Sequence, residues 1–166
     1  PRVPFAQILL LAVYYLLLAV VASVMLYRAL LIVRYYRCPR TDPEHAERFA
    51  SEPVITVQLP IYNEQFVVER LLEGVCALDW PREKLEVQLL DDTTDETVAI
   101  AARKVADLRA RGFDVQHLHR TDRTGYKAGA LDAGLRTATG EFVFIFDADF
   151  VAPPDILEKT LGHFAD

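Results

Sequence analysis

The chain has no excess of the basic residues on which a nucleic-acid-binding surface depends. Its 166 residues include 18 Lys and Arg against 24 Asp and Glu, which gives a net charge of −6 and an isoelectric point near 5.2. Contact with nucleic-acid phosphates needs clustered Lys and Arg, and these residues cluster only beside the apolar N-terminal stretch. We therefore expect no nucleic-acid partner.

Cysteine is also scarce. Cys38 and Cys76 are the 2 cysteines of the chain, and they form neither a CxxC spacing nor a dense disulfide framework. They are predicted to be reduced, structural thiols. His117 and His119 would point to one face of a short strand, but no third ligand stands at a suitable spacing, so we expect no zinc site. Internal repeats and low-complexity segments are absent.

A long apolar run opens the chain. Residues 5–27 carry no charge, and their number exceeds the roughly 20 residues with which a helix crosses the hydrocarbon of a bilayer. The apolar core of a cleaved signal peptide is only about 7 to 15 residues long. A buried core helix is the remaining alternative, although a segment that is apolar all round is typical of membranes. We predict a transmembrane helix with its cytosolic extension over 5–33.

Basic residues gather after this helix, and Arg2 alone precedes it. The positive-inside rule then places everything after the helix on the cytosolic side of an inner or plasma membrane, with the lipid bilayer as a partner. The arginines after the helix are Arg28, Arg34, Arg37 and Arg40. Residues 34–53 gain Pro and charge and lose the apolar period, which is typical of a juxtamembrane linker.

Strand and helix patterns alternate through residues 54–166. β-Branched and apolar runs predict four strands, at 54–59, which Pro60 ends, and at 85–90, 115–118 and 142–146. Helical spacing or helix-start signals predict helices at 64–78, 95–111 and 126–138 and from Pro153 onward. Alternating elements with continuous apolar strands predict an α/β, Rossmann-like parallel sheet with both faces covered.

Polar residues follow each of the four predicted strands. In open parallel sheets the ligand binds beyond the carboxyl ends of the strands, so we expect these residues to converge on one edge. They are Pro60 to Glu64, Asp91 to Asp95, His119 with Arg120, and Asp147 to Asp149.

Asp147 and Asp149 lie two residues apart at the end of the fourth strand. Carboxylates at this spacing can engage a hard divalent cation, with substrate phosphates as further ligands. Mg²⁺ or Mn²⁺ there would stabilise charge on a departing diphosphate. The alternative is a turn in which one of the two aspartates caps the following helix.

Asp91 and Asp92 are adjacent acids at the end of the second strand. They could accept hydrogen bonds from a nucleobase N–H and a ribose hydroxyl, whereas Thr93, Thr94 or Asp95 is better placed to cap the next helix. Because the two acids repel each other, we expect a ligand or a cation to compensate.

Lys127 falls in the first turn of a predicted helix. The helix dipole disfavours a cation there unless an anion is bound nearby, and a diphosphate would supply that anion. Gly125 and Gly129 allow a close approach of the backbone. An ordinary exposed lysine is the alternative. Arg120 and Arg123 are interpreted as surface charges, with help in neutralising phosphate as the alternative.

Together, the segments QLPIYNE, LLDDTTDET, RTGYKAGAL and FDADF resemble the family 2 inverting glycosyltransferases with a GT-A fold. The resemblance covers nearly everything after about Val54. The YKAGAL and FDADF strings are most similar to the processive membrane-embedded polysaccharide synthases, including cellulose synthase and the cellulose synthase-like glucan and mannan synthases. The fold implied is the N-terminal, nucleotide-binding half of a GT-A domain, following one transmembrane helix.

The resemblance assigns the nucleobase to the first two strand ends. Carried over by position, Tyr62 and Glu64 would contact the nucleobase and Asp92 would hydrogen-bond it. Asp91 is a further candidate for the same subsite.

The remaining roles implied by the resemblance concern the diphosphate and the metal. Lys127 would meet the diphosphate, Asp147 the ribose or the metal, and Asp149 the metal. No catalytic residue is assigned, because the T-E-D segment that carries the catalytic base in those synthases does not occur in the sequence.

Two other features of those synthases are missing as well: the Q-x-x-R-W acceptor segment and further transmembrane helices. The sequence also starts with Pro rather than Met. We therefore expect an N-terminal fragment of a longer enzyme, able to bind a nucleotide but not to turn over.

The activity implied is transfer of a hexose from a nucleotide sugar to a growing β-glycan, with inversion at the anomeric carbon. Glucose from UDP-glucose is the first expectation, and mannose from GDP-mannose, as in mannan synthases, is the alternative. Two other functions are weighed. In a haloacid-dehalogenase-like phosphotransferase, Asp147 would be the nucleophile of a D-x-D-x-T/V string, but that string usually follows the first strand. A membrane-bound nucleotide sensor is the non-catalytic alternative.

Overall fold

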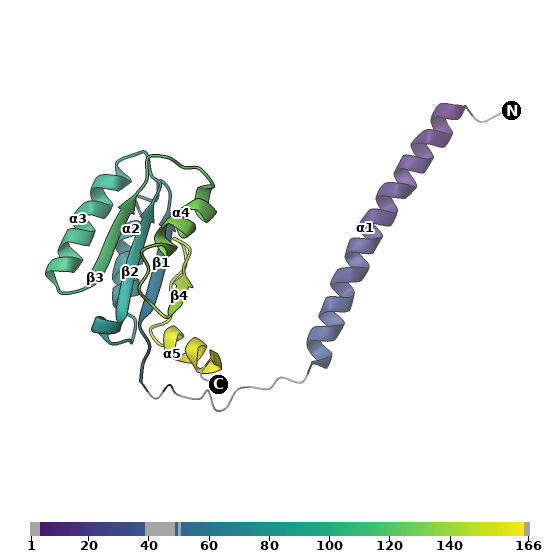
Figure 1. The fold of residues 1–166 in the computed structure, drawn as a ribbon. Coiled ribbons are helices and arrows are strands. Elements are labelled where there is room, and N and C mark those ends of the chain that lie inside the picture. Colours follow the sequence, from purple (N-terminus) through teal and green to yellow (C-terminus); the bar gives the residue numbers. More distant parts are fainter. Residues whose placement is uncertain (1–3, 39–48, 50, 165–166) are drawn as a thin grey trace. The chain divides into compact units, whose positions relative to one another are not determined.

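A computed structural model describes residues 4–38, 49 and 51–164 (Figure 1). The chain divides into two compact units, Pro1–Glu44 and His45–Asp166. Each unit is described by itself.

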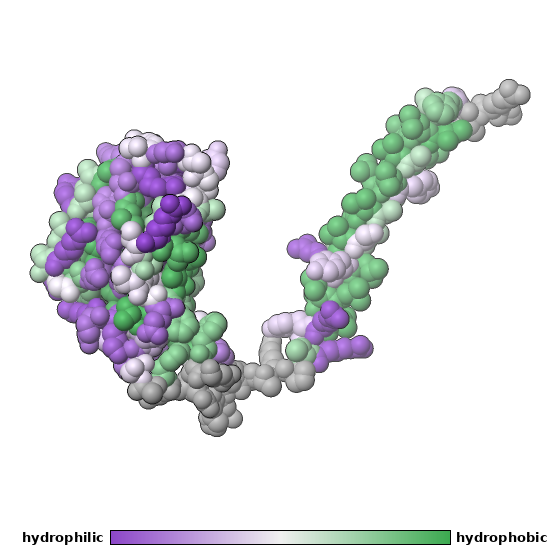
Figure 2. Space-filling view, viewed as in Figure 1, coloured by the Kyte–Doolittle hydropathy of each residue, from purple (hydrophilic) through white to green (hydrophobic). Residues whose placement is uncertain are grey.

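The first unit is one long helix, α1 (Phe5–Arg37), which has no buried residue among those described. Its 33 residues and its apolar composition make it long and apolar enough to cross a membrane. Figure 2 shows apolar side chains along it. The helix runs past the predicted end at residue 33 because residues 5–37 contain neither Gly nor Pro. Arginines near its C-terminus also suit the helix dipole. Of the predicted linker, residues 39–48 and 50 lie outside the described residues.

The second unit alternates strands and helices. Its strands are β1 (Ile55–Ile61), β2 (Leu85–Asp91), β3 (Asp114–His119) and β4 (Phe142–Ile145). Its helices are α2 (Val68–Cys76), α3 (Thr97–Ala110), α4 (Tyr126–Leu135) and α5 (Ile156–Leu161), with short 3₁₀ turns at Arg82–Lys84 and Gly162–Phe164.

All four strands are parallel and lie in the order β3-β2-β1-β4, which confirms the predicted α/β sheet. Val57 of β1 stands opposite Val87 of β2 and Phe144 of β4. Helices α2, α3 and α5 contribute side chains to the apolar core on one face of the sheet. Helix α4 covers β1 and β2 on the other face (Figure 1).

The core face is apolar, as predicted. Side chains that alternate along β1 and β2 are fully or almost fully buried there against the three helices. Strand pleating sends the intervening side chains to the opposite face. The core residues of the two central strands are Ile55, Val57, Leu59, Ile61, Leu85, Val87 and Leu89.

The face under α4 is buried but polar, so the prediction of continuous apolar strands is wrong for this face. Glu86 is only 2% exposed and accepts hydrogen bonds from Thr56 Oγ1 (2.6 Å), Gln116 Nε2 (2.7 Å) and the Thr139 backbone N–H (2.8 Å). Burial raises the pKa of the Glu86 carboxyl, but the hydrogen bonds from Thr56 and Thr139 outweigh it and hold the pKa below its usual value. Buried polar groups are tolerated because each finds a partner.

Strand β1 continues through Pro60, which was predicted to end it. The Gln58 carbonyl accepts a hydrogen bond from the Phe146 N–H, and the Ile61 carbonyl accepts one from Asp92 on the opposite side. Pro60 therefore directs its nitrogen to the same side as Gln58. Strand β4 has already ended there, so no ladder hydrogen bond is lost.

All four helices of this unit are shorter than predicted, and α2 and α4 show why. Helix α2 begins at Val68 rather than residue 64, because Asn63 adopts a left-handed conformation (φ 55°) and a turn closes on the Glu64 carbonyl. Helix α4 ends at Leu135 rather than residue 138, where the Thr137 N–H bonds back to Gly134.

Candidate functional site

A cavity of about 350 Å³ opens at the carboxyl ends of β1 and β4 and the start of α4. Polar residues from separate strand ends converge there, as the alternating pattern predicts for a parallel sheet. Of the predicted site residues, only Asp91 does not line it. The lining consists of Pro60, Ile61, Tyr62, Glu64, Asp92, Arg123, Lys127, Ala130, Asp147, Ala148 and Asp149.

Lys127 and Asp147 form an ion pair within this cavity. The Lys127 ammonium donates a hydrogen bond to Asp147 Oδ1. Both side chains keep about half or more of their surface exposed, 51% and 65%. The anion predicted beside Lys127 at the start of α4 is therefore supplied by the protein itself, and a bound diphosphate would have to replace or join it.

The carboxylates of Asp147 and Asp149 suit a hard divalent cation. Within residues 4–38, 49 and 51–164, no cluster of three or more His, Cys, Asp or Glu side chains could hold a metal. Mg²⁺ is commonly bound by one or two carboxylates together with substrate phosphates and water. The residues present thus fit a metal that enters with a phosphorylated ligand better than one held by the protein alone.

Asp92 lines the cavity with its carboxylate already paired. Arg120 donates two hydrogen bonds to it, from Nε to Oδ1 (2.8 Å) and from an Nη to Oδ2 (2.6 Å). The two parallel bonds of this bidentate pair fix the carboxylate's orientation. The interpretation of Arg120 as a surface charge is wrong.

Asp91 is fully buried on the core face of the sheet. Its carboxylate bonds to His117 Nε2 (2.7 Å) and accepts a hydrogen bond from the Thr93 backbone N–H (2.9 Å), and His119 Nδ1 lies 3.4 Å away. Burial raises the pKa of Asp91, but the hydrogen bonds from His117 and Thr93 outweigh it and keep the pKa below its usual value.

Protein groups therefore compensate both adjacent acids. The repulsion between Asp91 and Asp92 was predicted to require a ligand or a cation, but Arg120 and His117 already meet that need. Glu96 occupies the cap position of α3, and Asp95, one of the predicted caps, accepts the Thr97 N–H at 2.9 Å from the residue before it.

Arg123 lines the cavity, although a surface charge was preferred to a phosphate-neutralising role in its interpretation from the sequence. Its guanidinium carbon lies 3.3 Å from the centre of the Tyr62 ring and 5.2 Å from that of Tyr126. Its Nε is buried and has no hydrogen-bond partner within the described part of the chain. The flat cation on an aromatic face forms a platform at the rim of the cavity. A basic residue four positions before Lys127 was the available signal.

The backbone around the start of α4 is held close by two glycines, as predicted. Gly125 precedes the helix in a left-handed conformation (φ 76°). A Cβ on Gly129 would lie 2.1 Å from the Thr124 carbonyl oxygen, a distance that no side chain tolerates. This close turn brings Arg123 and Lys127 to the same cavity.

A side-chain hydrogen bond joins the first two strand ends. Asn63 Oδ1 accepts the Thr94 backbone N–H at 3.0 Å. The strained Asn63 conformation thus links the loop that carries Tyr62 and Glu64 to the loop after β2.

Comparison with protein families gives a match over most of the second unit. The sequence model of the family described as Glycosyl transferase family 2 matches residues 56–166. The match includes every strand end that lines the cavity.

Two rice (Oryza sativa subsp. japonica) proteins are similar in sequence. A "Probable glucomannan 4-beta-mannosyltransferase 6" is 43% identical over 135 residues, covering 77% of this chain and 23% of the relative. "Glucomannan 4-beta-mannosyltransferase 1" is 39% identical, covering 77% of this chain and 26% of the relative. The chain spans about a quarter of the length of these curated relatives.

A solved structure is also similar. The Pyrobaculum calidifontis mannosyltransferase PcManGT, in complex with GDP-mannose and Mn²⁺, is 32% identical with a TM-score of 0.72, over 88% of this chain and 43% of that one. Residues 1–349 of S. aureus TarS in complex with UDP are 24% identical with a TM-score of 0.55, over 64% of this chain and 30% of that one. The second likeness concerns the fold alone.

Proposed function

Because this chain belongs to glycosyl transferase family 2, we propose that its cavity binds a nucleotide-sugar donor with a divalent cation, for transfer of the hexose to a glycan acceptor. The observation that carries the proposal is the convergence of Lys127, Asp147 and Asp149 in the same cavity as Tyr62. A lysine and two carboxylates can neutralise and position a diphosphate, while an aromatic ring offers a face to the base.

GDP-mannose is the donor that we propose, in place of UDP-glucose. The rice relatives are described as glucomannan mannosyltransferases, and the similar solved structure contains GDP-mannose and Mn²⁺. The sequence alone gave UDP-glucose first and GDP-mannose as the alternative. The family assignment also leaves the phosphotransferase alternative without support, because residues 56–166, which include Asp147, match glycosyl transferase family 2.

In the proposed complex, Lys127 leaves Asp147 and turns its ammonium to the diphosphate. Asp147 and Asp149 would then hold the cation, and Asp147 would also be available to the ribose. When bound, the cation supplies positive charge to the leaving diphosphate. Tyr62 and Glu64 contact the base beside the Arg123 platform, and Arg120 orients Asp92 for a hydrogen bond to it.

Asp91 takes a positioning role in this proposal rather than a direct contact. Its carboxylate holds Thr93 and His117 from within the sheet, and so fixes the loop from which Asp92 reaches the cavity. The proposal also takes α1 as a membrane anchor, with the catalytic unit on the cytosolic side, which the arginines after its apolar run favour.

Calorimetric titration of the full chain with GDP-mannose and UDP-glucose, with and without Mn²⁺, tests the donor site. We expect GDP-mannose to bind only with the metal. Asp149→Ala removes a ligand of the cation and should weaken this binding at least tenfold, whereas Asp132→Ala, at an exposed carboxylate paired with Arg136, should not change it.

Three other outcomes would decide against parts of the proposal. Tighter binding of UDP-glucose would restore the first expectation for the donor. Equal affinities for GDP-mannose with and without Mn²⁺ would show that Asp147 and Asp149 do not hold a cation for this ligand. An absence of nucleotide binding, in a chain that circular dichroism shows to be folded, would reject the donor site.

A further inference from the structure

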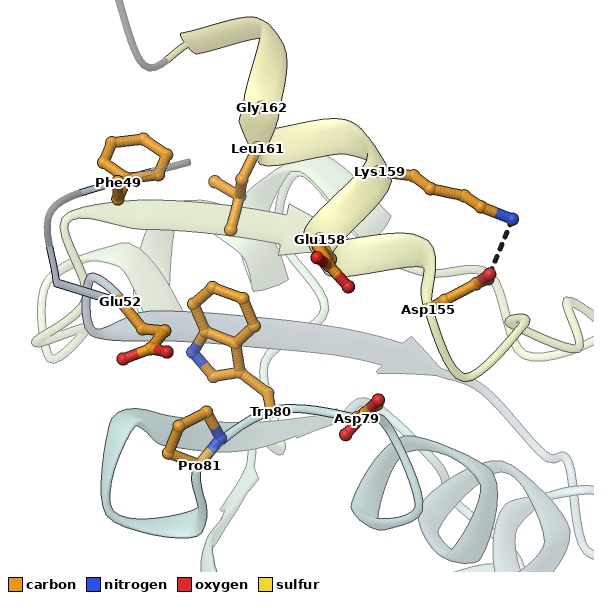
Figure 3. Close-up of a pocket in the computed structure, with 10 residues that line it drawn as sticks. All are labelled: Phe49, Glu52, Asp79, Trp80, Pro81, Asp155, Glu158, Lys159, Leu161 and Gly162. Carbon is orange, nitrogen blue, oxygen red and sulfur yellow. Dashed lines mark ion pairs between the residues drawn. The ribbon is translucent and has the colours of Figure 1, made fainter. Parts of the chain in front are cut away.

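A second and larger cavity lies at the opposite end of the strands, where β1 begins. Its volume is about 800 Å³, within the range of about 300–1,000 Å³ of small-molecule sites. Its walls come from the chain before β1, from the loop after α2 and from α5 (Figure 3). None of its lining residues lines the cavity in which we propose that the nucleotide sugar binds. The proposed donor therefore gives this second cavity no function.

The walls of this cavity are fixed by hydrogen bonds. The Asp79 N–H donates to the Pro154 carbonyl at 2.9 Å, which joins the loop after α2 to the segment before α5. Trp80 Nε1 donates to the Pro53 carbonyl at 3.3 Å. Phe49 packs edge-on against Phe142, with 5.7 Å between ring centres. The cavity is therefore pre-formed rather than a gap between loosely held loops.

The lining combines aromatic rings with carboxylates. Figure 3 shows the Trp80 indole in the middle of the lining residues, with Glu52 and Asp79 on either side. Four carboxylates line the cavity in all: Glu52, Asp79, Asp155 and Glu158.

Two of these carboxylates have lysine partners. Lys84 lies 3.6 Å from Glu52, and Lys159, itself a lining residue, lies 2.6 Å from Asp155. The cavity thus offers both acceptors and ammonium donors around a flat apolar surface.

This chemistry narrows the class of ligand. Carboxylates would repel a phosphate or a uronic acid. A purely apolar ligand would cover charged groups without giving them hydrogen bonds. A polycation would meet the ammonium of Lys159 and two carboxylates that are already paired. A neutral sugar ring suits the site, because its hydroxyls donate to carboxylates and its C–H face packs on an aromatic ring.

We propose that this cavity is a second carbohydrate site, which binds a neutral hexose oligosaccharide on Trp80 between Asp79 and Glu52. The proposal does not depend on the identity of the donor. The site would bind a glycan at the end of the strands opposite the proposed diphosphate and metal site.

Trp80 makes the proposal directly testable, since it is the only tryptophan among the 166 residues. Its fluorescence therefore reports on this cavity. The full chain, in an uncharged polyoxyethylene detergent that carries no sugar, is titrated with β-1,4-mannotetraose. We expect a saturable change in Trp80 emission, confirmed by calorimetry, with no change on adding sodium phosphate.

Asp79→Ala removes one acceptor but keeps the backbone bond to Pro154. It should raise the half-saturating tetrasaccharide concentration about tenfold, as the loss of one hydrogen bond to a charged group predicts. Asp132→Ala, outside the cavity, is the matched control and should have no effect. Circular dichroism melts confirm that both variants are folded.

Three results would overturn the proposal. The first is the absence of a saturable response in the folded chain. The second is an equal response of wild type and Asp79→Ala. The third is displacement of the oligosaccharide by a tri-arginine peptide at lower concentration, which would assign the cavity to a cationic protein segment instead.

Discussion

Arg123 shows how a single side chain can prepare a binding surface before the ligand arrives. Its guanidinium lies flat on Tyr62, with a second tyrosine, Tyr126, 5.2 Å from it. Its buried Nε still lacks an acceptor within the described part of the chain. A planar cation with an unused donor can both stack on a base and hydrogen-bond it, which a lysine cannot do.

We predict that Arg123→Ala weakens metal-dependent GDP binding by about tenfold, the effect of losing roughly 1–2 kcal/mol of stacking and cation–π attraction. Arg123→Lys keeps the charge but loses the flat surface, so it should restore less than half of that free energy. Calorimetry of both variants measures the effect. Arg103→Ala, at an exposed position on α3, is the control. Unchanged or tighter binding in Arg123→Ala would show that this side chain obstructs the base instead.

Asp91 and Asp92 mark the limit of what the sequence could predict about the site. Their place at a strand end followed from the apolar run before them. Because successive side chains of a strand point to opposite faces, one acid enters the core face and the other reaches the cavity. Which of the two does so depends on the partners His117 of β3 and Arg120 just after it, and both lie about 26 to 28 residues further along the chain.

At the scale of the elements, close contact between α4 and the sheet places the start of this helix beside the cavity that contains Lys127 and Asp147. Gly134 of α4 lies directly on the polar side chains of β1 and β2. A Cβ there would come within 2.7 Å of Gln58 Nε2 and 2.9 Å of Gln88 Oε1. A side chain at this position must displace these packed side chains, which share a hydrogen bond from Gln58 Nε2 to Gln88 Oε1, or move the helix.

We predict that Gly134→Ala destabilises the fold by about 1–3 kcal/mol through overpacking. Gly74→Ala is the matched substitution in α2, where a Cβ would meet nothing within 4 Å. It should stabilise the fold by roughly 0.5–1 kcal/mol, since Ala is the better helix former. Urea unfolding of both variants gives the two values. Shifts of the same sign would contradict the packing of α4 described here.

The order of strands and helices was predictable because each element has a strong local pattern. Pro60 was not, since its tolerance within β1 depends on where the neighbouring strand β4 stops. The buried polar face was also missed, because Gln58 and Glu86 look like ordinary exposed strand residues until α4 is placed over them.

At the scale of the whole molecule, α1 is the element that is long and apolar enough to cross a membrane. A helix of 33 residues is about 50 Å long, well beyond the roughly 30 Å of hydrocarbon in a bilayer. The surplus lets the arginines at its C-terminal end reach the water.

We predict that the full chain floats with liposomes after an alkaline carbonate wash. The double substitution Leu16→Arg and Val20→Arg should abolish flotation, because two arginines near the centre of a span cost on the order of 5 kcal/mol together. Leu16→Phe with Val20→Phe is the apolar control and should float. A double-arginine variant that still floats would show that α1 lies on the membrane surface or that another part of the chain holds the lipid.

The polar layer beneath α4 also bears on how reliably the sheet assembles. If β2 paired with its neighbours in a register shifted by one residue, Glu86 would face the apolar side chains of α2 and α3. It would then lose the hydrogen-bond donors that now surround it. An orphaned charge of this kind costs about 3–5 kcal/mol, a large part of a domain's whole stability. Glu86 therefore favours the observed strand register over a register shifted by one residue, because the shifted register would be the less stable of the two.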